Sequence, residues 1–131
     1  MERGWMMTGG IAAALAVAFG AFGAHALEGR LDAGTMSTYE TAVRYHMYTA
    51  LGLLAVALAA GRRPGSRRLR WAGWLLFAGL LIFSGSLYVL CLTGLSWLGM
   101  ITPLGGFCMV GGWLTLAAGF GGGKGSGQAQ S

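Results

Sequence analysis

Charged residues are scarce in this sequence of 131 residues and make up only 10% of it. A soluble domain carries roughly 25% charged residues. Hydrophobic residues reach 55% here, and a soluble fold of this size cannot bury so much apolar surface. Lipid must therefore cover much of the chain, which excludes an ordinary soluble domain and indicates an integral membrane protein.

Cysteine is also rare. The two cysteines, Cys91 and Cys108, lie within apolar runs, and no Cys-x-x-Cys pair is present. A zinc site usually takes three or four protein ligands, and the apolar runs hold no Asp or Glu at a matching spacing. We therefore interpret both residues as buried thiols, and we expect no metal centre and no cofactor.

What the sequence does have is four long apolar segments. Each approaches the roughly 20 residues that cross a hydrocarbon core of about 30 Å. An open sheet is excluded because its edge groups would be unpaired in lipid. We predict an all-α, integral membrane four-helix bundle over residues 1–120 and a flexible glycine-rich tail over residues 121–131. The predicted helices cover about residues 5–27, 38–60, 70–92 and 96–120.

The first segment resembles a secretory signal, because it begins near Arg3 and contains the small-residue pattern AHA at residues 24–26. Its apolar run is long for a signal, however, and the rest of the chain is itself membranous. We therefore expect this helix to be retained.

Two helix starts carry local signals. Ser37 followed by Glu40 has the spacing of a capping box, which predicts a second helix that begins at Thr38. For the fourth helix, Ser96 can act as the cap and leave Pro103 to kink the helix. Alternatively, Thr102 is the cap and Pro103 takes the first helical position, where its missing N–H costs nothing. We favour the second alternative slightly.

The net charge of +5 depends largely on one basic stretch, GRRPGSRRLR at residues 61–70. With Arg3 and Lys124, its arginines would lie on one side of the membrane, and only Arg30 and Arg44 on the other. The positive-inside rule then predicts a bacterial inner-membrane protein with cytoplasmic termini. We expect the lipid bilayer, not nucleic acid, to be the partner of this basic loop, which contains Arg62, Arg63, Arg67, Arg68 and Arg70.

Polar side chains gather near the predicted outer ends of the four helices. Imidazole can ligate a metal or haem, relay a proton or hydrogen-bond a quinone carbonyl, so the two histidines are the most notable members. The competing interpretation is structural, with both rings bonded to neighbouring carbonyls, hydroxyls or water. The candidate cluster consists of His25, His46, Ser84, Ser86, Tyr88 and Thr102.

Small residues lie inside three of the apolar segments, in GAFGA, FSGS and PLGGF. In lipid, such residues let helix backbones approach one another closely. We predict helix packing at Gly20, Gly23, Gly85, Gly105 and Gly106.

Four blocks, in this order, resemble the transmembrane protein 256 family, also called the domain of unknown function 423 family. They are GAFGAHAL, TYETAVRYHMYTALGLL, IFSGSLYVLCLTG and GMITPLGGFCMVGGW. The resemblance implies a small multi-pass protein of bacterial inner membranes, with no established activity or cofactor. The family pattern YxMYHAL departs here to YHMYTAL, so Thr49 takes the usual histidine position and His46 lies one turn earlier. Because residues three apart share a helix face, Thr49 joins the candidate cluster.

Two functions follow as expectations. The first is a non-enzymatic accessory or assembly component that packs against itself or a larger membrane complex through its small-residue faces. The alternative is a binding or transport site for a proton, metal ion or small molecule in an outer-facing pocket lined by His25, His46 and Tyr88. We do not expect an enzyme, because no GxSxG elbow or orienting carboxylate is present.

Overall fold

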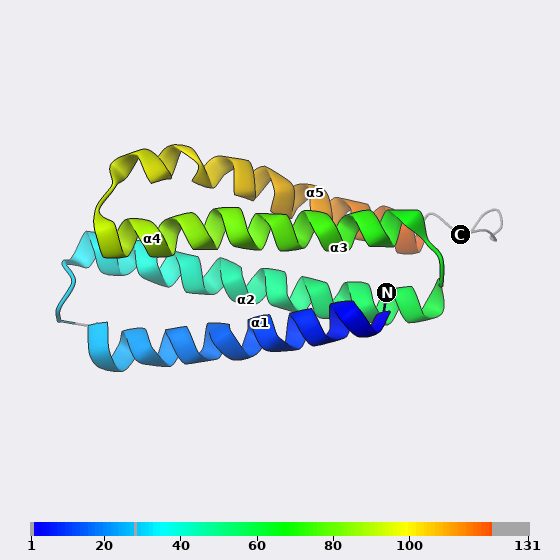
Figure 1. Cartoon of the computed structure of the whole chain (residues 1–131), viewed down its shortest axis with the longest axis horizontal. Helices are drawn as coiled ribbons and strands as arrows, with labels where there is room; N and C mark the ends of the chain where they lie inside the picture. The colour runs from blue at the N-terminus through cyan, green and yellow to red at the C-terminus, as the bar shows by residue number, and fades with distance from the viewer. Residues whose placement is uncertain (1, 28, 122–131) are drawn as a thin grey trace.

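The computed structural model describes residues 2–27 and 29–121, and all long elements in that part are helices. Residues 122–131, which hold Lys124 and the rest of the predicted tail after Gly121, lie outside the described residues. Long helices run back and forth along one direction (Figure 1). The elements are α1 (Glu2–Phe22) with its π-helical continuation η1 (Gly23–Leu27), α2 (Ala33–Arg62), α3 (Arg67–Gly79), the π-helical segment η2 (Leu80–Ser84), α4 (Gly85–Thr93), the 3₁₀ segment η3 (Ser96–Met100) and α5 (Thr102–Gly121).

Four helical passes are long and apolar enough to cross a membrane. The shortest contains 24 residues and the longest 30, which exceeds the roughly 20 needed for the hydrocarbon core. The third pass is continuous, because α3, η2 and α4 follow one another without a break. The predicted all-α fold with four membrane-spanning helices is confirmed.

The helices pack as two hairpins. α1 packs along α2, and α5 packs along α3, while α2 joins the hairpins by packing against α3, η2 and α4. As a result, α1 and α5 lie at opposite edges of the molecule (Figure 1). Two grooves remain, one between α1 and the α3–α4 pass and the other between α2 and α5.

Glycine permits the closest helix contact, between α5 and the third pass. A Cβ atom on Gly105 would overlap the backbone nitrogen of Phe83. A Cβ on Gly79 would lie 2.9 Å from the carbonyl oxygen of Gly105. A Cβ on Gly106, by contrast, would lie 3.7 Å from the Phe83 ring, which is an ordinary contact. The two backbones therefore approach closely at Gly79 and Gly105, as small residues allow in membrane helices.

The start of α2 differs from the prediction. The helix begins at Ala33 instead of Thr38, and its N-cap is Asp32, whose Oδ1 accepts a hydrogen bond of 2.7 Å from the Thr35 backbone N–H. Ser37 is therefore inside the helix, where its carbonyl accepts an intrahelical bond and its side chain caps nothing. An aspartate cap further upstream is as favourable as a serine cap, and it adds a turn to the helix.

The observed start of α5 agrees with the alternative in which the fourth helix begins beside Thr102 and Pro103. The α-helix begins at Thr102, with Pro103 in the first turn, and the segment Ser96–Met100 forms a separate 3₁₀ turn. The Thr102 hydroxyl donates to the Leu98 carbonyl at 3.3 Å. Thr102 is therefore the first helical residue instead of the cap, and Pro103 needs no N–H partner at this position.

Candidate functional site

A buried histidine and the hydroxyl of a half-buried tyrosine meet between α2 and α4. The His46 Nδ1 atom lies 2.8 Å from the Tyr88 hydroxyl, and the side chain of His46 is only 5% exposed. The Phe19 ring of α1 contacts both side chains edge-on, with centroids 5.9 Å from His46 and 5.2 Å from Tyr88. Tyr39 adds a fourth ring, 5.7 Å from Tyr88. Three helices thus meet at one aromatic cluster with a hydrogen-bonded pair inside it.

This pair lines the groove between α1 and the third pass, which we name the α1–α4 groove. The groove has a volume of about 330 Å³. His46 reaches it because that residue shares the buried face of α2 with Ala42 and Ala50, one turn away on each side. Its lining includes Thr8, Ala12, His46, Ser84, Gly85 and Tyr88.

The other predicted polar residues form separate contacts. The Ser84 hydroxyl donates to the Ala42 carbonyl of α2 at 2.9 Å. The Ser86 and Thr102 hydroxyls lie 2.6 Å apart and join α4 to α5. Thr49 is buried and donates to the Tyr45 carbonyl one turn earlier, at 2.8 Å. The structure therefore brings Ser84 beside the His46–Tyr88 pair, but it places Ser86, Thr102 and Thr49 on the α5 side of the molecule.

His25 lies away from this group. Its side chain is exposed, in the π-helical segment that ends α1. Among the described residues, no hydrogen bond or ring contact joins it to His46 or Tyr88. The α1 face that packs inward here carries Gly23, whose Cβ would overlap the Tyr39 ring. The sequence placed His25 and His46 at one depth, and this is wrong: α2 begins at Ala33 instead of Thr38, so His46 lies more than a turn deeper, beside Phe19, whereas His25 lies near the α1–α2 turn.

The glycines expected to pack differ in what they contact. A Cβ on Gly20 would lie 3.4 Å from a Val43 methyl group, and Gly23 and Gly105 are closer still to their neighbours. A Cβ on Gly85, however, would meet nothing within 4 Å. The predicted helix packing at Gly85 is therefore not found in the structure, and Gly85 lines the α1–α4 groove instead.

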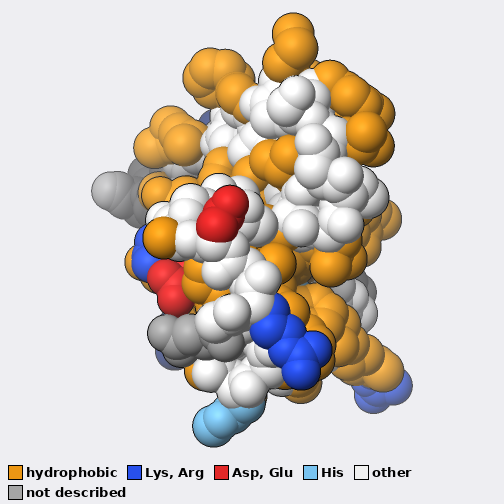
Figure 2. All heavy atoms as spheres, turned by 90° about the vertical axis from the view of Figure 1, so that its left-hand side faces the viewer, with side chains coloured by type: hydrophobic (Ala, Val, Ile, Leu, Met, Phe, Trp, Pro, Cys, Tyr) orange, Lys and Arg blue, Asp and Glu red, His pale blue; other side chains and the backbone are white. Residues whose placement is uncertain are grey.

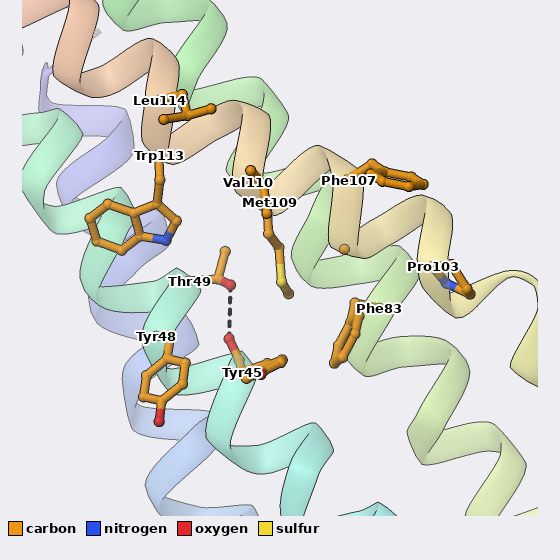
Figure 3. A pocket seen from close by; sticks show the side chains of 11 residues that line it. Tyr45, Tyr48, Thr49, Phe83, Pro103, Phe107, Met109, Val110, Trp113 and Leu114 are labelled. Carbon is orange, nitrogen blue, oxygen red and sulfur yellow. Dashed lines mark hydrogen bonds between the residues drawn. The ribbon is translucent and has the colours of Figure 1, made fainter.

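A second and larger groove, the α2–α5 groove, has a volume of about 590 Å³. Figure 3 shows side chains from α2, η2 and α5 around it, with the Thr49–Tyr45 hydrogen bond at its side. Five of its eleven lining residues are aromatic, namely Tyr45, Tyr48, Phe83, Phe107 and Trp113. Sequence reasoning missed this groove. The spacing of Phe107, Val110 and Trp113 along one face of α5 was the available signal.

The π-helical segment Leu80–Ser84 is a feature that the sequence did not indicate. Phe83 lines the α2–α5 groove, whereas Ser84 lines the α1–α4 groove. The segment therefore lies between the two grooves, and its consecutive residues Phe83 and Ser84 line different ones. Single π-helical turns are often found at functional sites.

The two ends of the molecule differ in charge. The arginines of the basic loop lie at the end where α2 and α3 meet, and Arg68 donates to the Ala118 carbonyl of α5 at 3.2 Å. The opposite end, with the α1–α2 turn, carries charged side chains of both signs beside apolar ones (Figure 2). The fold places the basic loop at one end of the molecule. Which side of the membrane that end faces stays a prediction.

The chemistry available at the candidate site is that of neutral polar groups. The described lining of the α1–α4 groove contains no Asp, Glu, Lys or Arg side chain. Within residues 2–27 and 29–121, no group of three or more His, Cys, Asp or Glu is placed to hold a metal ion. The site can therefore donate and accept hydrogen bonds from an imidazole and a phenol in apolar surroundings.

Comparison with known proteins places this architecture in a family. The profile described as "Protein of unknown function (DUF423)" matches residues 19–106, a region that contains both His46 and Tyr88. This chain belongs to the DUF423 family. The resemblance noted from the four sequence blocks is thereby confirmed.

Relatives of this DUF423 protein are also membrane proteins by name. The UPF0382 membrane protein YwdK of Bacillus subtilis is 48% identical over 112 residues, which cover 86% of this chain and 91% of the relative. The UPF0382 membrane protein SERP0230 of Staphylococcus epidermidis is 50% identical over 112 residues, covering 86% and 90%. No solved structure matches the chain. The four apolar helices and the names of these relatives confirm the expected multi-pass membrane location.

Proposed function

We propose that this DUF423 protein is a non-enzymatic membrane component that assembles with a second copy of itself through the exposed face of α1. The single observation that carries this proposal is a stripe of small, exposed residues on that face. Gly10, Ala14 and Ala18 are four residues apart and exposed, and a Cβ on Gly10 would meet nothing within 4 Å.

The physical reason for assembly is close backbone approach. Lipid tails are as apolar as leucine, so apolar side chains alone give membrane helices little reason to associate. Small residues at a spacing of four lower the distance between two helix axes and so increase van der Waals contact. α1 is available for such a contact because only 17% of its most apolar stretch is buried and it lies at one edge of the molecule (Figure 1).

The orientation that we propose places both termini and the basic loop in the cytoplasm of a bacterial inner membrane. The cluster of arginines between α2 and α3 supports it, through the positive-inside rule. In this orientation the α1–α2 turn faces outward.

Disulfide crosslinking in native membranes tests the assembly. Cys91 and Cys108 are first replaced by alanine, and Ala14→Cys is then introduced on the proposed face. Leu114→Cys serves as a matched control, since Leu114 is 65% exposed on α5 at the opposite edge. We expect an oxidised dimer for Ala14→Cys and a monomer for Leu114→Cys. A monomer in both variants would overturn the proposal.

A second candidate function is the binding of a small molecule in the α1–α4 groove. The observation that favours it is the hydrogen-bonded His46–Tyr88 pair in the groove lining. Mass spectrometry of molecules that copurify with the protein tests it. Wild-type protein should retain a small molecule that the groove-filling variant Gly85→Leu loses, and equal recovery from both would contradict this function.

A further inference from the structure

The α1–α4 groove has the features of a site for one chemical class of ligand. We infer that it binds an uncharged, lipid-soluble molecule that carries a carbonyl oxygen on a ring, as a quinone does, and that this oxygen accepts a hydrogen bond from the His46–Tyr88 pair. The inference rests on the second candidate function above and adds the class of the ligand and the atoms that recognise it.

The lining excludes a charged ligand. It contains no Asp, Glu, Lys or Arg side chain within the described residues, so an anionic or cationic group would be desolvated without a counter-charge. The hydroxyls of Thr8 and Ser84 already donate to the carbonyls of Gly4 and Ala42, at 2.8 Å and 2.9 Å. Most of the remaining lining is apolar, which fits a ligand that is itself mainly apolar.

The proton balance of the His46–Tyr88 pair leaves one donor for a ligand. If the Tyr88 hydroxyl donates to Nδ1, the neutral imidazole carries its proton on Nε2. The carbonyl of Ala12, which also lines the groove, is the competing acceptor near this ring. Ala12 lies within α1, where its carbonyl accepts the helical bond and keeps a second lone pair, as the Ala42 carbonyl does for Ser84. The Ala12 carbonyl is therefore the partner of the Nε2–H group when no ligand is bound, and a ligand carbonyl would replace it there.

The size and opening of the groove agree with this class. A volume of about 330 Å³ is at the lower end of small-molecule sites. Gly85 keeps it open, because a Cβ at that position would meet nothing within 4 Å. The same fact provides a blocking variant, Gly85→Leu, whose Cβ meets no neighbouring atom and whose longer side chain occupies space at the groove lining.

Nitrogen-15 NMR of histidine-labelled protein in lipid nanodiscs tests the inference. The probes are duroquinone and durene, two methylated rings of the same outline, of which only the first has carbonyl oxygens. Duroquinone has no free ring position for thiol addition, so Cys91 and Cys108 do not react with it. His25, which is exposed and outside the groove, is the internal reference. Gly4→Leu is the control variant, since a Cβ on Gly4 also meets nothing within 4 Å.

We expect duroquinone to shift the His46 resonances saturably, to leave those of His25 unchanged and to bind about tenfold more tightly than durene, the effect of one hydrogen bond. Tyr88→Phe should lower duroquinone affinity by a similar factor and Gly85→Leu should abolish the shift, whereas Gly4→Leu should not change it. Equal binding of duroquinone and durene would overturn the inference but retain the binding function. No saturable shift with either probe, or an undiminished shift in Gly85→Leu, would contradict both.

Discussion

Gly105 of α5 lies so close to the Phe83 backbone nitrogen that a Cβ atom between them would overlap it. This contact brings α5 against the π-helical segment of the third pass. It therefore fixes the position of the α2–α5 groove, which Phe83 lines.

The first prediction concerns this contact. Gly105→Ala should destabilise the protein by roughly 1–3 kcal/mol, because the backbones of α5 and η2 must separate. Gly106→Ala, one residue later, should be neutral or stabilising by up to about 1 kcal/mol, since its Cβ has room and alanine favours the helix. Reversible unfolding in mixed micelles measures both. Equal loss of stability in the two variants would show that the close approach is not as described.

The hydroxyl pair Ser86–Thr102 gives a second prediction. Its separation of 2.6 Å indicates a hydrogen bond between α4 and the first turn of α5. Ser86→Ala and Thr102→Val should each cost about 1 kcal/mol, and the double variant should cost less than their sum, because both remove the same bond. A double-mutant cycle on the free energy of unfolding tests this. Strict additivity would indicate that the two hydroxyls do not interact.

The N-cap of α2 predicts a pH dependence. The hydrogen bonds from the Thr35 side chain and backbone hold the pKa of Asp32 below its ordinary value of 3.8. The cap therefore stabilises α2 fully above that ordinary value, and its contribution is lost as the pH falls through the lower, folded pKa. Amide exchange at Thr35 should accelerate over this acidic range. Asp32→Asn keeps a cap but does not titrate, so its exchange should lack this transition; an identical transition there would assign it to another group.

The orientation gives a fourth prediction. In a cysteine-free background, Arg67→Cys in the basic loop should resist a membrane-impermeant maleimide applied to intact cells. Arg30→Cys, at the exposed α1–α2 turn, should react. Permeabilised cells control for reactivity in both variants. Labelling of Arg67→Cys from outside would place the termini and the basic loop on the outer side.

The sequence was sufficient for the four helices, because apolar runs of membrane-spanning length admit few other structures. It was less informative at helix starts. Asp32 and Ser37 are both good caps, and the sequence pattern favoured Ser37 because Glu40 completes its capping box. The structure uses Asp32, which satisfies the Thr35 N–H and lengthens α2 on the side where it packs against α4.

Some members of the site could be predicted from the sequence, but their depths and their directions around each helix could not. Counting residues from the helix ends brought His25, His46 and Tyr88 to a similar level, and the structure pairs His46 with Tyr88. The count assumed that α2 begins at Thr38, but it begins at Ala33, so His46 lies more than a turn deeper and His25 stays exposed near the α1–α2 turn. The η2 segment and the separation of the two grooves had no signal in the sequence pattern.

The central claim, assembly through α1, is tested most directly by the mass of the protein in nanodiscs excised from native membranes with a polymer. Wild-type protein should be found as a dimer, and Gly10→Ile as a monomer that is no less stable to heat, because a Cβ on Gly10 meets no other part of its own chain within 4 Å and glycine is the poorer helix former. The same mass for wild-type and Gly10→Ile, whether monomer or dimer, would contradict the claim.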